Sequence, residues 1–331
     1  MTMIEQAMDS QGHESIQKDT REEHNASASK SVLVKGINGN ASITLYADGT
    51  RIIDYPGEDA QIIDLEYPLN VDIKLSSRCA FGMDPRTQKA VCSFCHESAR
   101  TDGIEGDYER LETILSVLPL TTEIALGINE VTEDLIQFLS RLKQQGRIVN
   151  GTFNQGLIRT GAHRAITDQK LLNGIGISWR RASWGIDDPI YLDPNTVLHV
   201  IAGIDDFDEI SDVIKAGAVR KLLILGEKDF GFNQGNVDIK SPSHLKWQKK
   251  KLHELFEHAL ISFDNLAIEQ LRVRRYFGNK NWSVFHQGER SIYLDAVKKV
   301  FAPSSRSNET VSWGSMNLQE YWNTVKIEKQ D

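Results

Sequence analysis

The sequence predicts an α/β fold in which helices cover parallel strands. Two observations support this fold: six short apolar runs follow one another between residues 71 and 226, and helical patterns alternate with them. Runs of five or six apolar residues are typical of buried strands, and helices are the usual crossovers between parallel strands. The alternation fits a doubly wound sheet as well as an open or closed (β/α) barrel.

The six predicted units show no internal repeat beyond this alternation. The predicted strands cover residues 71–75, 122–128, 148–154, 174–179, 197–203 and 221–226. The predicted helices cover residues 108–117, 133–144, 165–172, 207–216 and 243–258. Gly146 marks the end of the second, amphipathic helix. In either architecture the reactive groups lie at the carboxyl ends of the strands, so the polar residues and glycines found there are expected to converge.

A small β element is predicted before the first unit. Residues 42–53 alternate around Asp48-Gly49, a dipeptide that favours a hairpin turn, and a second short strand is expected over 61–65. The stretch between Gln11 and Ser31 has almost no bulky apolar side chains. It cannot bury enough surface to become ordered, and we expect a disordered tail there.

The composition limits the classes of function. The net charge of −8 provides no electrostatic footprint for nucleic acid, and Lys246 and 249–251 are expected to form a solvated helix face, although a local basic patch leaves nucleic acid open. No apolar run reaches the roughly 18 residues of a membrane span. The N-terminus lacks the apolar core of a signal peptide. These features, with an odd number of cysteines, predict a cytoplasmic protein without a disulfide scaffold.

All three cysteines, Cys79, Cys92 and Cys95, lie in one window of seventeen residues after the first predicted strand. One alternative is three small side chains in the core, although the loop between them is too polar for that. A second is a structural zinc site with His96, although adjacent residues are awkward joint ligands. The third is an iron–sulfur cluster. Three thiolates on a four-iron cluster leave one iron open to bind a small molecule, which would explain the odd number.

Three cysteines in such a loop, with Phe94 just before the last, resemble the radical S-adenosylmethionine (radical SAM) superfamily. Its usual spacing is Cys-x3-Cys-x2-Cys; this chain keeps the second interval and expands the first to twelve residues. Further stretches resemble a group of radical SAM proteins from bacteria and phages: VDIKLSSRC, CSFCHESARTDGIEGD, HVIAGI, LLILGEKDFG, SFDNLAIEQL and IYLDAVKKVFAPSS. Together the matches extend over roughly residues 68–305.

The resemblance implies a partial (β/α)6 TIM-like barrel with a small N-terminal β element and a C-terminal extension. The chain would divide into a tail (1–31), the β element (32–66), the barrel (67–260) and a C-terminal segment (261–331) that closes or covers it. The three cysteines would hold a [4Fe-4S] cluster whose open iron binds S-adenosylmethionine. Reductive cleavage would yield methionine and a 5′-deoxyadenosyl radical that takes a hydrogen atom from the substrate. The implied partners are a small-molecule or peptide substrate and an electron donor such as flavodoxin or ferredoxin.

The resemblance also assigns residues to S-adenosylmethionine. The turn from Gly127 to Glu130, with Asn129, stands where the family binds the methionine amino group; Glu130 is equally suited to cap or begin the following helix. The other matched cofactor positions are Phe94 and the ends of strands four and five, at Ser178, Arg180, Ile201 and Gly203. Asn154, at the end of the third strand, is a further candidate contact.

Candidates for the chemistry on the substrate lie mostly in the C-terminal segment. Asp264 and Asn265 follow a probable strand over 260–263, and Tyr293 would relay a hydrogen atom or an electron, or simply pack as a ring. Weaker candidates are Gln155, Lys228, Glu269, His286 and Asp295. Two alternatives stay open: a zinc-stabilised interaction module, and a nucleotide- or nucleic-acid-modifying radical enzyme. The insertion between Cys79 and Cys92 is expected to form a turn and a short helix beside the cluster.

Overall fold

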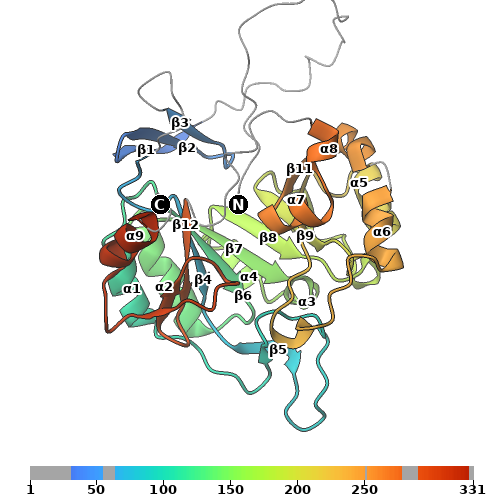
Figure 1. Ribbon diagram of the computed structural model, residues 1–331, viewed down its shortest axis with the longest axis horizontal. Helices are drawn as coiled ribbons and strands as arrows, with labels where there is room; N and C mark the ends of the chain where they lie inside the picture. Colours follow the sequence, from blue (N-terminus) through green and yellow to red (C-terminus); the bar gives the residue numbers. More distant parts are fainter. Residues whose placement is uncertain (1–30, 55–63, 250–251, 278–289, 328–331) are drawn as a thin grey trace, which may run out of the picture.

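The computed structural model describes residues 31–54, 64–249, 252–277 and 290–327 (Figure 1). Its main layer is a ten-stranded sheet with the order β11-β10-β9-β8-β7-β6-β4-β12-β13-β14. The eight strands from β11 to β12 are parallel, and β13 and β14 are antiparallel. The α/β fold predicted from the alternation is confirmed. Over the described residues the sheet is open, since β11 and β14 end it without pairing to each other.

The strands of the sheet are β4 (Asn70–Lys74), β6 (Glu123–Ile128), β7 (Ile148–Asn154), β8 (Gly174–Ser178), β9 (Thr196–Ile201), β10 (Lys221–Leu225), β11 (Leu260–Phe263), β12 (Ser291–Asp295), β13 (Val300–Ala302) and β14 (Val311–Ser312). The helices are α1 (Tyr108–Leu115), α2 (Glu133–Gln144), α3 (Gln155–Arg159), α4 (Arg164–Thr167), α5 (Phe207–Lys215), α6 (Pro242–Lys249), α7 (Asn265–Gln270), α8 (Arg274–Phe277) and α9 (Leu318–Ile327). Short 3-10 turns are η1 (Ala182–Trp184), η2 (Pro189–Leu192), η3 (Gly231–Asn233) and η4 (Leu252–Glu257).

The predicted helices agree with the structure where caps are strong. Helix α2 has the predicted bounds because the Thr132 side chain accepts the N–H of Leu135 and Gly146, at φ +72°, ends the helix. The helix predicted over 165–172 is wrong in its bounds. The Asn154 side chain accepts the N–H of Gly156 and starts α3 directly after β7, so this connection forms two short helices. The helix predicted over 243–258 is α6 followed by η4.

The two faces of the parallel sheet differ in polarity. On one face, register places buried apolar side chains side by side, and the buried residues of α2 and α5 belong to the same core: Ile73, Leu126, Phe153, Ile177, Leu198 and Ile224. On the other face the same register aligns small and polar residues: Asp72, Lys74, Gly127, Thr152, Ser178 and His199. Helices therefore bury the first face, and the second offers polar groups toward the carboxyl ends of the strands.

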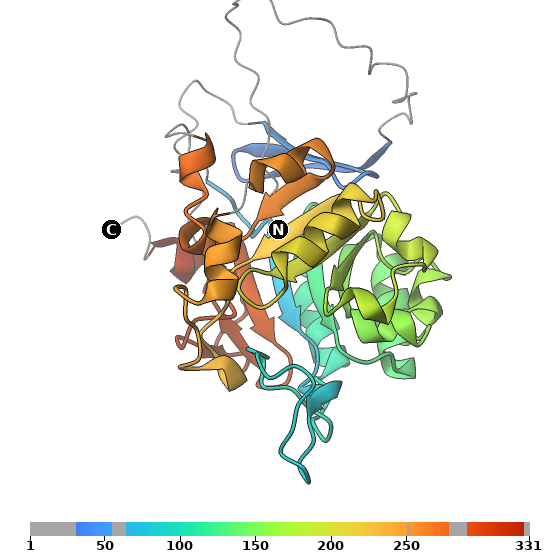
Figure 2. The same ribbon diagram turned by 90° about the vertical axis from the view of Figure 1, so that its right-hand side faces the viewer.

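The N-terminal residues form a separate antiparallel sheet of β1 (Val32–Asn38), β2 (Ala41–Tyr46) and β3 (Arg51–Asp54). The predicted hairpin at Asp48-Gly49 is confirmed. The chain at this turn accepts hydrogen bonds from Asn195 and Lys221, which lie at the amino ends of β9 and β10. The small sheet thus lies at the amino ends of the parallel strands, and the cysteine loop, which follows β4, lies at their carboxyl ends (Figures 1 and 2). The tail (1–30) and most of the strand expected over 61–65 lie outside the described residues.

The C-terminal residues join the sheet at its far edge. Strand β12 pairs in parallel with β4 in the register Ser291↔Asn70 to Asp295↔Lys74. Helix α9 packs behind this edge, where the Trp322 indole donates to the carbonyl of Leu65 at 3.2 Å. Within the described residues, no helix has the length and apolar character of a membrane span.

Candidate cluster and cofactor site

The cysteine loop begins with β5 (Arg78–Met83), directly after β4. The insertion continues as a turn closed by a bridge between Asp84 and Lys89, and the chain projects from the lower end of the molecule (Figures 1 and 2). The expected short helix is wrong. The Asp84 carboxylate accepts the N–H of Arg86, and Gln88 has a left-handed φ of 54°, so the chain reverses before a helix can form.

Phe81 anchors the base of this insertion. Its ring lies 5.8 Å, centroid to centroid, from the ring of Trp184 in η1. It also covers Gly156 at the start of α3, where an added Cβ would come within 2.0 Å of the Phe81 ring. The insertion is therefore packed against the ends of β7 and β8.

The three thiols gather at the carboxyl end of β4. Cys79 and Cys92 are buried and Cys95 is half-buried. The Cys95 N–H donates to the Cys92 carbonyl at 3.1 Å, and the Val91 N–H donates to the Phe81 carbonyl at 3.1 Å, so the segments that carry the three cysteines lie against one another. Burial is the main cause that raises the pKa of Cys79 and the pKa of Cys95. Nearby backbone groups oppose both increases in pKa, at Phe81 for Cys79 and at Ala99 and then Glu97 for Cys95.

The thiols are not gathered as ligands of one ion. Over the described residues, no three His, Cys, Asp or Glu side chains converge as a site for a single metal ion. His96, the proposed fourth zinc ligand, places its Nε2 atom 3.1 Å from the Glu97 carboxylate and 3.2 Å from Lys228 Nζ. A four-iron cluster takes its thiolates on different irons, so its ligands stand farther apart than the ligands of one zinc ion.

The turn after β6 lies beside the cysteine loop. Gly127 is exposed on the polar face, and a Cβ added there would meet no atom within 4 Å. Glu130 pairs with Arg78, the residue before Cys79, at 2.5 Å between Oε2 and Nε. The capping alternative for Glu130 is wrong, because Thr132 caps α2. Asn129, which lies between Gly127 and Glu130 in the sequence, is half-buried.

Arg180 and Phe94 are brought together from separate strands and loops. The Arg180 guanidinium lies 5.1 Å from the Phe94 ring centroid, and its charge opposes the raised pKa of Cys79. Within the described part of the chain, the buried Arg180 Nε has no hydrogen-bond partner. Gln155 is fully buried and accepts the N–H groups of Arg180 and Arg181, so it positions this segment.

The remaining cofactor candidates lie along neighbouring strand ends. Ser178 is beside His199 in register, and Asn154 Nδ2 is 4.0 Å from Cys92 Sγ. Ile201 donates its N–H to the buried carboxylate of Asp205 at 2.6 Å. Gly203 has φ +97°, and a Cβ there would lie 2.4 Å from His244 Nδ1. Asp205 and His244 were not predicted from the sequence, because an isolated buried polar residue forms no recognisable motif.

Asp264 and Asn265 differ in their surroundings. Asp264 Oδ1 accepts the N–H groups of Ala267 at 2.6 Å and Gly226 at 2.9 Å, so it caps α7 and ties it to the end of β10. Burial raises the pKa of Asp264. Asn265 Oδ1 is buried without a partner among the described residues, which leaves it available to a ligand.

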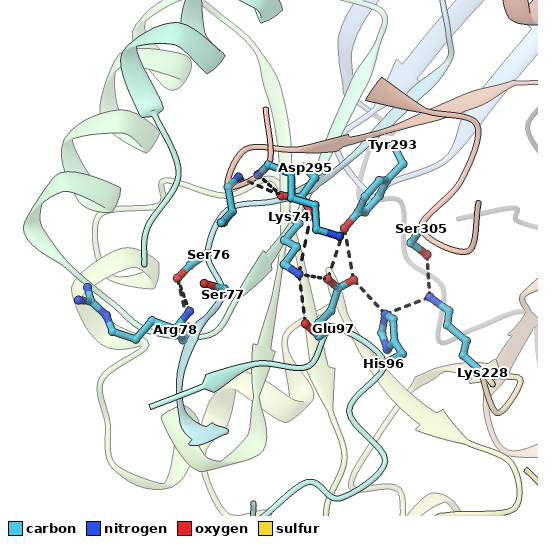
Figure 3. A network of polar contacts seen from close by, with 12 residues as sticks. Lys74, Ser76, Ser77, Arg78, His96, Glu97, Lys228, Tyr293, Asp295 and Ser305 are labelled. Atoms are coloured by element: carbon cyan, nitrogen blue, oxygen red, sulfur yellow. Dashed lines mark hydrogen bonds and ion pairs between the residues drawn. The ribbon is translucent and has the colours of Figure 1, made fainter. Parts of the chain in front are cut away.

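Tyr293 belongs to a polar network between the sheet and the cysteine loop (Figure 3). Its hydroxyl lies 3.4 Å from both carboxylate oxygens of Glu97, and Lys74 Nζ lies 2.8 Å from Glu97 Oε2 and 4.0 Å from Asp295. Burial, and next the charge of Glu97, raise the pKa of Tyr293 far above its ordinary value. Lys74 and Glu97 were missed as site residues, although a lysine within the apolar run of β4 was a usable signal. His286 lies outside the described residues.

Neither the family models nor the curated proteins against which the chain was compared include a match to it.

Proposed function

We propose that the chain is a radical SAM enzyme that holds a [4Fe-4S] cluster on Cys79, Cys92 and Cys95. The observation that carries this proposal is that the thiols, the only ones in the chain, lie at the carboxyl ends of the strands beside Asn154 and Arg180: Asn154 Nδ2 is 4.0 Å from Cys92 Sγ, and the Arg180 guanidinium is 5.1 Å from the ring of Phe94, which precedes Cys95. When bound, the cluster would cleave S-adenosylmethionine reductively to methionine and a 5′-deoxyadenosyl radical that takes a hydrogen atom from the substrate.

We also propose that the sheet is the wall of a partial (β/α)6 TIM-like barrel. The one-sided burial supports this: apolar residues such as Phe153 face the helices, and Lys74, Thr152 and Ser178 share the opposite face. In a barrel that face would be the interior, and its carboxyl end would be the mouth. The division into a β element, barrel and C-terminal segment follows the same proposal.

The donor set fits the proposed cluster. Thiolates suit iron–sulfur clusters, and N–H groups that donate to ligating sulfur atoms stabilise the negative charge there. The N–H groups of Phe81, Ala99 and Glu97, which favour the charged forms of Cys79 and Cys95 by lowering their pKa, would supply such bonds.

The chain also offers groups for each part of S-adenosylmethionine. Arg180 would bind the methionine carboxylate through its planar fork, and Asn129 and Glu130 would bind the amino group. Gly127 has open space beside it, in which the methionine part of S-adenosylmethionine would lie. Ser178 would contact the ribose, and Phe94, Ile201 and Gly203 would contact adenine.

The substrate would enter at the carboxyl ends of the parallel strands. Asn265 and Lys228 are the candidates to bind it, and Tyr293, whose hydroxyl lies 3.4 Å from the Glu97 carboxylate, is the candidate to relay a hydrogen atom or an electron. A flavodoxin or ferredoxin would supply the electron, in a cytoplasmic setting.

Anaerobic reconstitution tests the proposal. We expect a brown protein with about four irons and four sulfides per chain, and dithionite with S-adenosylmethionine should release 5′-deoxyadenosine. The Cys95→Ser variant should lose the cluster signal and the product, whereas Ser93→Ala, at an exposed position of the same loop, should keep both. A colourless protein carrying one zinc ion would contradict the proposal and favour the interaction module.

A further inference from the structure

Glu97 connects the cysteine loop to the sheet. It follows Cys95 by two residues, inside a turn in which the Ser98 N–H donates to the Cys95 carbonyl at 3.3 Å. The position of Glu97 therefore determines the conformation of the turn that begins at Cys95. The hydrogen bonds and solvent exposure that such a turn gives to a ligating sulfur tune the reduction potential of an iron–sulfur cluster.

Lys74 holds Glu97 by two separate groups. Its Nζ atom lies 2.8 Å from the Glu97 carboxylate and donates to the Glu97 backbone carbonyl at 3.2 Å (Figure 3). Lys74 is the last residue of β4, and its side chain is only 11% exposed. Lys74, at the end of β4, thus binds both the side chain and the main-chain carbonyl of Glu97 in the loop.

Neighbouring strands and loops hold the same carboxylate. The Tyr293 hydroxyl of β12 reaches both oxygens of Glu97, and His96 Nε2 lies 3.1 Å from one of them. Lys228, after β10, contacts His96 and donates to Ser305 at 3.0 Å. Lys74 and Tyr293, from two strands that are far apart in the sequence, therefore contact Glu97 directly, and Lys228 is connected to it through His96.

We propose that Lys74 and Glu97 form a positioning pair that fixes the Cys95 corner of the cluster site, by holding the turn that begins at Cys95 against the end of β4. This inference rests on the proposed cluster and extends it. Neither residue would ligate iron; both would act through the placement of Cys95. Residues that orient ligands in this way commonly change metal affinity by about 10- to 100-fold when replaced.

The experiment compares iron release and spectra in the full chain. Lys74→Met and Glu97→Gln break the pair, Lys74→Arg conserves the charge, and Arg141→Met breaks a remote pair whose Nε and Glu112 Oε2 atoms are 2.7 Å apart. Each protein is reconstituted anaerobically, checked for folding by circular dichroism and exposed to an iron chelator. The electron paramagnetic resonance spectrum and the midpoint potential of the reduced cluster are then recorded.

We expect Lys74→Met to release iron about 10-fold faster than the wild type, with a changed spectrum and a shifted potential, because the turn that holds Cys95 is no longer fixed to β4. Glu97→Gln should show a smaller change, Lys74→Arg should recover most of the wild-type behaviour, and Arg141→Met should match the wild type.

The outcomes separate the two proposals. A wild-type chain that holds no cluster overturns the proposed function and this inference with it. A wild-type chain that holds the cluster, beside Glu97→Gln and Lys74→Met proteins with unchanged release, spectrum and potential, overturns the positioning pair alone. If Lys74→Met does not fold, a wild-type result for Glu97→Gln is sufficient to overturn it.

Discussion

At the scale of single residues, the surroundings of two glycines show which one is needed for packing and which one lies beside open space. A Cβ on Gly151 would lie 2.7 Å from Ile128 and Leu172, whereas a Cβ on Gly127 would meet nothing within 4 Å. Both positions lie in neighbouring strands, β7 and β6. The space beside Gly151 is thus occupied by packed side chains, and that beside Gly127 is open toward the proposed cofactor.

The Gly127→Ala substitution should therefore separate stability from binding. We expect an unchanged or slightly higher melting temperature, because no protein atom opposes the methyl group and alanine restricts the unfolded chain. S-adenosylmethionine should bind the reconstituted protein at least about tenfold more weakly, equivalent to about 1.4 kcal/mol. Calorimetry measures both quantities. The Gly151→Ala control should instead lose stability, and equal affinity in Gly127→Ala and wild type would remove this turn from the cofactor site.

Asp205 should make stability depend on pH. Burial raises its pKa to about 7 from an ordinary value of 3.8. The folded state then binds a proton more tightly than the unfolded state, so its contribution to stability is complete below about pH 4 and is lost as the pH rises toward 7. Each unit in that window removes up to about 1.4 kcal/mol.

The Asp205→Asn variant should flatten this dependence, because asparagine stays neutral and can still accept the N–H of Ile201. Urea unfolding at pH 5 and pH 8 measures the effect. We expect the wild type to lose more stability than the variant between these two values. Parallel losses in both proteins would show that Asp205 is ionised throughout.

At the scale of elements, local signals predicted most strands and helices of the first six units. The apolar runs and caps are properties of short segments, so β6, α2 and β10 lie where the sequence predicts them. The insertion is different, because its conformation depends on partners elsewhere. Phe81 packs on Gly156 and Trp184, residues more than 70 positions further along the chain.

This packing predicts coupling between Phe81 and Gly156. Gly156→Ala should destabilise the protein by about 1–3 kcal/mol, because the methyl group would overlap the Phe81 ring. In Phe81→Ala the ring is absent, so the same substitution should have little further effect. A double-mutant cycle by denaturant unfolding measures the coupling. Strictly additive effects would mean that the two side chains are not in contact.

At the scale of the whole molecule, the C-terminal residues complete the sheet. Strand β12 lies beside β4, more than 200 residues earlier, and brings Tyr293 and Asp295 to the edge of the cysteine loop. Trp322 in α9 is almost fully buried behind the same edge. The stability of this edge should therefore depend on the far end of the chain.

Trp322→Ala should lower the free energy of unfolding by about 3–5 kcal/mol, as expected for a large side chain removed from a core. The indole also loses its hydrogen bond to Leu65. Leu192→Ala, at a side chain that is 49% exposed, should change stability by less than about 0.5 kcal/mol. Guanidinium unfolding compares the two, and similar midpoints would mean that α9 is not part of the cooperative unit.

The α/β class, most strands of the parallel sheet and the N-terminal hairpin could be predicted from the sequence, in which all the thiols also follow the first strand. These features are local, since apolar periodicity, turn dipeptides and caps act over a few residues. The polar groups that meet the cysteine loop could be identified from the tertiary structure and not from such local patterns. Lys74, Glu97, Tyr293 and Lys228 come from four separate segments, and their contacts depend on strand order and side-chain packing, which no short stretch of sequence encodes.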